Sequence, residues 1–194
     1  MAKKTLCNTK GRIVDAAWKL FYEQGYEDTT VEDIVRLSAT SKGSFYHYFA
    51  GKDDLLGSLA YLFDEKYEEL AAALDPNATA LELLLRLNKE LFVMIENRIE
   101  ISLLTRLLST QLTVQGSKQL LDHNRVYFKL LRRIITEGQQ RGEITTERTV
   151  SEIVRLYALT ERALLYDWCL RGGDYSLSDY AARTLPLLLA GLTK

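Results

Sequence analysis

Residues 41–56 read SKGSFYHYFAGKDDLL, and this stretch gives the strongest evidence in the sequence for the fold class. Ser41 is a natural N-cap, because a serine hydroxyl accepts a hydrogen bond from a free N–H group at a helix start. It predicts a short helix over about 42–48. Phe45 and Phe49 lie four positions apart on one face of that helix, so we expect both side chains to point inward.

Two further helices are predicted before this stretch. Apolar residues recur at helical spacing over about 9–24, and Gly25 follows, as glycine often does just past a helix end. A second, short helix starts at a capping box. Two pairs of residues fit that box: Thr29 with Glu32, or Thr30 with Asp33.

The second and third helices are separated by a four-residue turn, Ser38-Ala39-Thr40-Ser41. Two short helices joined by such a turn, behind a first helix, form a helix-turn-helix pattern. The steep packing angle in this motif needs apolar residues on the inner faces. Four residues are expected there: Ile34, Leu37, Phe45 and Phe49.

The outer face of the third helix is the predicted DNA-reading surface, because a helix that enters a major groove must be narrow and polar outward. The outward positions carry polar side chains: Lys42, Ser44, Tyr46 and His47. Gly43 has no side chain and lets the backbone approach a duplex closely. Residues flanking the groove are expected to hold phosphates: Thr29, Thr30 and Lys52.

This region resembles the DNA-binding domain of the tetracycline-repressor (TetR/AcrR) family. The resemblance is carried by 41–49 (SKGSFYHYF), 52–56 (KDDLL), Gly25-Tyr26 and 29–34 (TTVEDI). It covers roughly residues 9–60; the remainder is similar only in length and helical layout. It implies a fold of nine or more helices, a homodimer formed mainly by the last two long helices, and ligand-gated repression.

On the matched positions, the resemblance implies two sets of DNA contacts. Phosphate contacts are implied for Thr29 or Thr30, Tyr46, His47 and Lys52, and base-edge contacts for Lys42, Gly43 or Ser44. The turn departs from the family pattern, since Ala39-Thr40 stands where Gly-Val is common. An alanine in the left-handed conformation costs about 1–2 kcal/mol, so either the turn relaxes or the domain is slightly less stable.

Charge alone does not predict DNA binding, because the net charge is only −1. Positive charge is instead concentrated at two points along the sequence: Lys3, Lys4, Lys10 and Arg12, then Arg36, Lys42 and Lys52. Taken alone, these charges favour a solvated surface over a DNA-binding one. The aromatic residues of the motif also have an alternative role as core residues, and helix-turn-helix units occur in proteins that never contact DNA.

The rest of the chain predicts an all-α protein, with a helix-turn-helix domain over 1–52 joined by a long helix to a ligand-sensing and dimerisation domain over 53–194. A fourth helix is expected over about 53–74, ending before the Asp75-Pro76-Asn77 break. Five more are expected over 78–98, 100–112, 117–140, 147–171 and 177–192, separated by glycine-containing breaks. We expect the last two helices to form a twofold homodimer interface.

An internal ligand pocket is indicated by polar residues within apolar helical stripes, because burying such groups costs free energy unless they find partners. The candidate lining residues are Asn88, His123, Asn124, Tyr127, Tyr157 and Glu161. The alternative for each polar residue is a partner inside the protein: a backbone carbonyl, an arginine such as Arg98 or Arg106, or the dimer mate.

Catalysis has no support in the sequence. The histidines, His47 and His123, have neither metal-ligand spacing nor an adjacent cysteine, and no phosphate-binding or dinucleotide motif is present, so neither cofactor nor metal is expected. Cys7 and Cys169 form no disulfide framework, which suits a reducing, cytoplasmic setting. We expect no signal peptide and no membrane span, since no apolar run is long enough.

The sequence therefore predicts a ligand-responsive transcription regulator, a repressor, that binds a pseudo-palindromic double-stranded DNA operator as a homodimer. Its effector is an unidentified small molecule held among the C-terminal helices, which shifts the protein between conformations. The alternative is an all-helical DNA-architectural or interaction module with no small-molecule effector.

Overall fold

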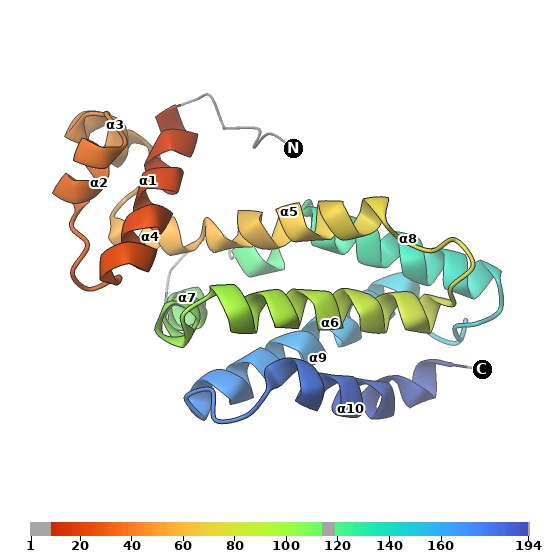
Figure 1. The fold of residues 1–194 in the computed structure, drawn as a ribbon. Coiled ribbons are helices and arrows are strands. Elements are labelled where there is room, and N and C mark those ends of the chain that lie inside the picture. Colours follow the sequence, from red (N-terminus) through yellow and green to blue (C-terminus); the bar gives the residue numbers. More distant parts are fainter. Residues whose placement is uncertain (1–8, 114–118, 194) are drawn as a thin grey trace. The chain divides into compact units, whose positions relative to one another are not determined.

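The computed structural model describes residues 9–113 and 119–193, and every regular element in them is helical, which confirms the predicted all-α class (Figure 1). The predicted features at Lys3, Lys4, Cys7, Gly116 and Ser117 lie outside these residues. The α-helices are α1 Thr9–Gln24, α2 Val31–Leu37, α3 Lys42–Tyr48, α4 Lys52–Leu56, α5 Leu59–Ala72, α6 Ala80–Arg98, α7 Ile101–Thr113, α8 Val126–Gln140, α9 Val150–Leu170 and α10 Leu177–Leu189. Two short 3-10 helices are Gln119–Leu121 and Ala190–Leu192.

The chain divides into two compact units, Met1–Leu59 and Ala60–Lys194. We call the described part of the first unit the head and that of the second the body. The boundary between these two units falls after Leu59, later in the chain than the predicted domain boundary at 52/53. The assignment of DNA binding and ligand sensing to separate domains stays a prediction.

Local signals define the ends of three helices of the head, the starts of α2 and α3 and the end of α1. The Thr30 side chain accepts a hydrogen bond from the N–H of Asp33, and the Asp33 carboxylate accepts one from the N–H of Thr30, so this pair is the capping box of α2. Ser41 caps α3 by accepting a hydrogen bond from the N–H of Ser44 at 3.0 Å. Gly25 ends α1 with a φ of +88°, the left-handed conformation that glycine adopts without strain.

The core of the head is built on Ile34, Phe45 and Phe49, all buried as predicted. Leu37, however, is 43% exposed, and its predicted place in the core is wrong. The inward phase of α2 continues from Ile34 to the buried Ser38, four positions further on. Leu37 therefore falls beside that face rather than on it.

The turn between α2 and α3 keeps the left-handed conformation. Ala39 has a φ of +51°, so the turn has not relaxed to suit an alanine. The carbonyl of Ala39 accepts a hydrogen bond from the Arg12 side chain at 3.5 Å, and the N–H of Thr40 donates to the carbonyl of Val35 at 3.1 Å. These contacts hold the turn in a geometry that costs an alanine about 1–2 kcal/mol.

The single fourth helix expected over 53–74 is two helices, α4 and α5, interrupted at Gly57-Ser58. The Ser58 hydroxyl donates to the carbonyl of Leu55 at 2.5 Å and accepts a hydrogen bond from the Trp18 indole N–H at 2.7 Å. Serine competes in this way for backbone groups that a continuous helix would use. The break therefore lies where α1 is bonded to the end of α4.

In the body, α6 and α10 run side by side, and α9 packs against α7, α8 and α10 (Figure 1). The core consists of leucine, isoleucine and aromatic side chains from these helices, among them Leu87, Ile95, Ile135 and Tyr157. No helix within the described ranges is both long and apolar enough to cross a membrane.

The helix predicted over 117–140 begins only at Val126 within the described residues. Asp122 makes a turn in front of it: its side chain accepts a hydrogen bond from the N–H of Asn124 at 2.9 Å, and its carbonyl accepts one from the N–H of Arg125 at 3.2 Å. An aspartate that binds the backbone two residues later favours a turn over a helix.

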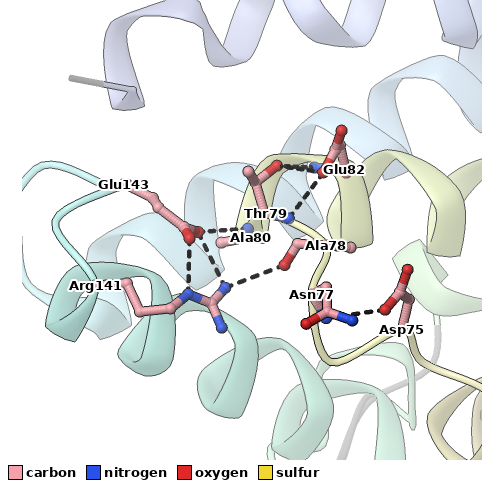
Figure 2. Close-up of polar contacts among 8 residues, drawn as sticks. All are labelled: Asp75, Asn77, Ala78, Thr79, Ala80, Glu82, Arg141 and Glu143. Atoms are coloured by element: carbon pink, nitrogen blue, oxygen red, sulfur yellow. Dashed lines mark hydrogen bonds and ion pairs between the residues drawn. The ribbon is translucent and has the colours of Figure 1, made fainter.

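The start of α6 is joined to the loop after α8 by a polar cluster (Figure 2). The Glu143 carboxylate accepts hydrogen bonds from the backbone N–H of Ala80 at 2.7 Å and from the Arg141 guanidinium at 2.7 and 3.0 Å. The guanidinium also donates to the carbonyl of Ala78 at 3.4 Å. Close packing accompanies these bonds, because a Cβ at Gly138 would lie only 2.5 Å from the Cβ of Ala80.

Candidate nucleic-acid interface and internal pocket

The outer face of α3 is exposed and polar. Phe45 points inward at 0% exposure, whereas its neighbour Tyr46 is 56% exposed, and Lys42 and His47 are exposed as well. A Cβ at Gly43 would meet only the Ser41 hydroxyl at 3.8 Å, so packing within the head does not require glycine there. Because Gly43 has no side chain, the surface of α3 is low at this position, and such a shape suits close contact with a duplex.

Lys42 forms an ion pair with Glu32 of α2. The lysine lowers the pKa of the Glu32 carboxyl and the glutamate raises the pKa of the Lys42 ammonium, chiefly through the hydrogen bond between them. Both side chains are more than half exposed, so the pair contributes little stability and is readily exchanged for another partner. Ser44, half-buried, bonds to the Ser41 hydroxyl at 2.9 Å.

Lys52 is bound to the loop after α1. Its ammonium donates to the carbonyls of Tyr26 at 2.6 Å, Thr29 at 2.9 Å and Glu27 at 3.3 Å, and it lies 4.2 Å from the centre of the Tyr26 ring. Three carbonyls match the three protons of an ammonium group. Lys52 thus holds this loop together, and its predicted phosphate contact needs some of these bonds to be exchanged.

The two threonines predicted to hold phosphates differ in exposure. Thr29 is 1% exposed and its hydroxyl donates to the carbonyl of Gly25 at 2.7 Å, so its side chain is directed into the head. Thr30 is exposed, and its hydroxyl takes part in the capping box with Asp33. Of the two, Thr30 is the residue placed on the surface.

The body contains a pocket of about 50 Å³ lined by residues of α5, α6, α7, α8 and α9 and of the segment between α7 and α8. Most of the lining is apolar: Phe63, Leu91, Phe92, Leu104, Leu107, Leu108, Leu120, Ala158 and Leu165. Its polar lining residues are Tyr67, Arg125, Tyr127, Glu161 and Arg162. An apolar cavity with a few convergent polar groups is the usual form of a small-molecule site.

A buried hydrogen-bond network lies at this pocket. Glu161, 4% exposed, accepts hydrogen bonds from the Asn88 amide at 2.8 Å and the Tyr127 hydroxyl at 2.5 Å. Burial raises the pKa of the Glu161 carboxyl, and hydrogen bonding by Tyr127, Asn88 and Tyr157 opposes the rise. The Tyr157 hydroxyl donates to the carbonyl of Leu84 at 2.7 Å and also interacts with the Glu161 carboxyl group.

The structure therefore brings together four of the six residues predicted for the pocket: Asn88, Tyr127, Tyr157 and Glu161. Two of them, Tyr127 and Glu161, line it. His123 and Asn124 are exposed and are absent from its lining. Both precede Val126, the true start of α8, so they lie in a turn and not on the apolar stripe of that helix. This corrects their predicted position.

Two family models match the chain. The model described as bacterial regulatory proteins, tetR family, matches residues 13–59, and the model of the YsiA-like protein C-terminal region matches residues 61–191. The chain belongs to the tetR family of bacterial regulatory proteins. This membership confirms the predicted function as a DNA-binding transcription regulator of the ligand-responsive tetR type.

Several relatives of this tetR regulator align over more than nine tenths of its length. It is 27% identical over 185 residues to the fatty acid metabolism regulator protein of Bacillus subtilis, covering 93% of this chain and 94% of the relative. The structure of FadR from Bacillus subtilis in complex with stearoyl-CoA is 25% identical, with a TM-score of 0.69, covering 93% and 98% of the two chains. FadR from Thermus thermophilus, in complex with lauroyl-CoA, shares the fold at 21% identity and a TM-score of 0.76, covering 96% of each chain.

Three polar residues of the tetR pocket escape prediction from the sequence. Tyr67 looks like an ordinary core aromatic on α5, and Arg125 and Arg162 look like surface charges. Arg125 is paired with Asp64 of α5 at 3.0 Å and also donates to the carbonyl of Ala60 at 2.9 Å. Such partners lie about sixty residues away in the sequence, and helical periodicity carries no signal for them.

No group of three or more His, Cys, Asp or Glu side chains in residues 9–113 and 119–193 is arranged to hold a metal ion. Cys169, on α9, is half-buried with a free thiol, and burial raises its pKa.

Glu161→Gln should make the free energy of unfolding of the body less dependent on pH. Burial raises the Glu161 pKa in the folded protein above its ordinary 4.5, so the associated stability is present below that value and is lost as pH rises through the folded pKa. Glutamine carries no such proton. In urea unfolding between pH 5 and 8, we expect the parent to lose stability relative to Glu161→Gln, by at most about 1.4 kcal/mol per pH unit. Parallel pH profiles of the two proteins would contradict this.

Proposed function

We propose that the protein is a repressor that binds a pseudo-palindromic operator as a homodimer and is released from it by a long-chain acyl-CoA. The observation that carries the effector class is the leucine- and phenylalanine-lined pocket in the body. It is found in a chain that aligns over 93% of its length with a fatty acid metabolism regulator. As a protein that binds the chromosome, it acts in the cytoplasm.

DNA recognition is assigned to the exposed face of α3. Lys42, Gly43 and Ser44, at its start, are proposed to reach base edges in the major groove. Tyr46, His47 and Thr30 are proposed to contact phosphates on either side. The exposure of Lys42, Tyr46 and His47 supports this division, and the weak Lys42–Glu32 pair leaves the lysine available to a base.

The two lysines of this interface should behave differently when each is replaced by alanine. Lys42→Ala should leave the melting temperature unchanged but weaken operator binding by about 1–3 kcal/mol, because it removes a base contact. Lys52→Ala should lower the stability of the head by about 2 kcal/mol, because hydrogen bonds from a charged donor to three carbonyls are lost. Thermal unfolding and operator titrations at several salt concentrations measure both effects. A Lys52→Ala variant that melts like the parent and has a shallower salt slope would instead assign Lys52 mainly to phosphates.

Dimerisation is assigned to α9 and α10. An apolar stripe at alternating spacings of three and four residues runs along the exposed side of α9: Leu156, Leu159, Ala163, Tyr166 and Leu170. On α10, Leu187 and Leu188 are 77% and 52% exposed. Exposed apolar surface on two adjacent helices supports an isologous four-helix interface between two copies. Two recognition helices about 34 Å apart then read two half-sites.

The effector is assigned to the pocket because its chemistry suits an acyl thioester. The apolar lining provides the surroundings that an alkyl chain needs. Arg162, half-buried on α9, adds positive charge at the pocket, which suits the phosphates of coenzyme A. Binding there must favour the conformation with lower DNA affinity if it is to release the operator.

Operator release by palmitoyl-CoA tests this function. With a labelled palindrome from the region upstream of the gene, fluorescence anisotropy should show two chains bound per duplex. Palmitoyl-CoA should weaken that binding at least tenfold, which requires about 1.4 kcal/mol of differential binding, whereas free coenzyme A should have no effect. Arg162→Ala should bind the operator like the parent but need more palmitoyl-CoA for release. Operator affinity unchanged at saturating palmitoyl-CoA would refute the proposed effector.

A further inference from the structure

Tyr67 is one of the polar residues that line the pocket of the body. It lies on α5, is 2% exposed and lines the pocket. Its ring packs against that of Tyr127 with 5.0 Å between ring centres. Tyr67 is therefore held in place by packing, next to the carboxyl group of Glu161 that Tyr127 binds.

The Tyr67 hydroxyl has no hydrogen-bond partner anywhere in residues 9–113 and 119–193. The two nearby buried tyrosines differ, since the Tyr127 hydroxyl donates to Glu161 at 2.5 Å and the Tyr157 hydroxyl donates to the Leu84 carbonyl at 2.7 Å. A buried hydroxyl left without a partner costs free energy, and such groups are rare in proteins. An unbonded hydroxyl on a buried residue that lines a cavity points to a partner that enters the cavity.

The neighbouring groups define what this partner offers. Glu161 already accepts hydrogen bonds from Asn88 and Tyr127, and Arg125 is engaged with Asp64 and a backbone carbonyl. Tyr67 contributes an uncharged O–H donor in a lining that is otherwise mostly apolar. The complementary group is an uncharged acceptor next to an apolar chain, and the carbonyl oxygen of an acyl thioester is such a group.

We infer that the Tyr67 hydroxyl donates a hydrogen bond to the thioester carbonyl of the effector and so selects acyl thioesters over ligands that lack this oxygen. The inference rests on the proposed function and assigns recognition of the thioester group to Tyr67.

A double-mutant cycle between protein and ligand tests the inference. Palmitoyl-CoA is compared with S-hexadecyl-CoA, a thioether of the same chain length without the carbonyl oxygen, by calorimetry below the concentrations at which either forms micelles. The parent should bind the thioester about five- to tenfold more tightly than the thioether, as expected for one net hydrogen bond. In Tyr67→Phe, the two ligands should bind within twofold of each other.

Tyr157→Phe is the matched control, because it also removes a buried hydroxyl from the body. That hydroxyl is bonded to Leu84 and interacts with Glu161, but Tyr157 itself does not line the pocket. Tyr157→Phe should lower the melting temperature and keep the preference for the thioester. Tyr67→Phe should melt at or above the temperature of the parent, since no bond is lost.

The outcomes separate the inference from the proposed function. If the parent binds neither ligand, the acyl-CoA effector is wrong and the inference fails with it. If the parent binds both ligands and Tyr67→Phe keeps the parent's preference, only the role of Tyr67 is wrong. A melting temperature of Tyr67→Phe as low as that of Tyr157→Phe would also overturn the inference, because the hydroxyl would then be bonded in the unliganded protein.

Discussion

Phe45→Ala should unfold the head and abolish operator binding. Phe45 is completely buried on α3 and packs against Phe49, with 5.8 Å between their ring centres. Truncating a buried phenylalanine to alanine costs about 3–5 kcal/mol, because both transfer free energy and cavity formation contribute. A unit as small as the head has little stability to lose. Circular dichroism should show partial loss of helix at 25 °C, and anisotropy should show no specific binding.

Tyr46→Ala is the matched control, since it removes an aromatic ring from the next position of the same helix. Tyr46 is 56% exposed, so this variant should melt within about 0.5 kcal/mol of the parent while binding DNA more weakly. If Phe45→Ala melts like the parent and still binds the operator, α3 is not anchored as described.

Gly138→Val should destabilise the body by about 3 kcal/mol, comparable to the loss of a core side chain. A Cβ at this position would lie 2.5 Å from the Cβ of Ala80 and 3.0 Å from the Cδ1 of Ile144, well inside normal contact distances. The start of α6 must then move, and this strains the bonds from Ala80 and Arg141 to Glu143 (Figure 2). Urea unfolding of the parent and the variant measures the difference.

Gly43→Ala provides the contrast within the same protein. Its Cβ would meet only the Ser41 hydroxyl at 3.8 Å, so alanine should stabilise α3 by up to about 1 kcal/mol through its higher helix propensity. The added methyl group should nevertheless weaken operator binding, because it stands on the proposed DNA-reading face.

A Gly138→Val variant as stable as the parent would mean that α6 and α8 approach less closely than the structure indicates.

The helices of the head were predictable because their signals are local. The Ser41 and Thr30 caps, the left-handed Gly25 and the inward spacing of Phe45 and Phe49 all lie within a few residues of what they determine. The break at Gly57-Ser58 was not predictable, since it depends on a bond from Trp18, forty residues earlier. Leu37 was misplaced because Ser38, a small polar residue, takes the inward position.

The pocket was predictable only in part for the same reason. Polar residues within an apolar stripe correctly marked Asn88 and Glu161 as buried. Tyr67 stands out because its hydroxyl has no hydrogen-bond partner among the described residues. That depends on how α5 to α9 pack together and not on the sequence of any one helix. His123 and Asn124 show the converse error, where a two-residue turn at Asp122 cancelled the expected helical phase.

The small size of the pocket has a consequence for the speed of the response. Small-molecule sites usually occupy about 300–1,000 Å³, whereas the pocket of the body has a volume of about 50 Å³. For the proposed acyl chain to enter, leucine and phenylalanine side chains must therefore move apart, and this opening would precede binding. The observed association rate should then level off at high effector concentration instead of rising in proportion to it. A regulator gated in this way follows sustained changes in effector concentration and filters out those shorter than its opening time.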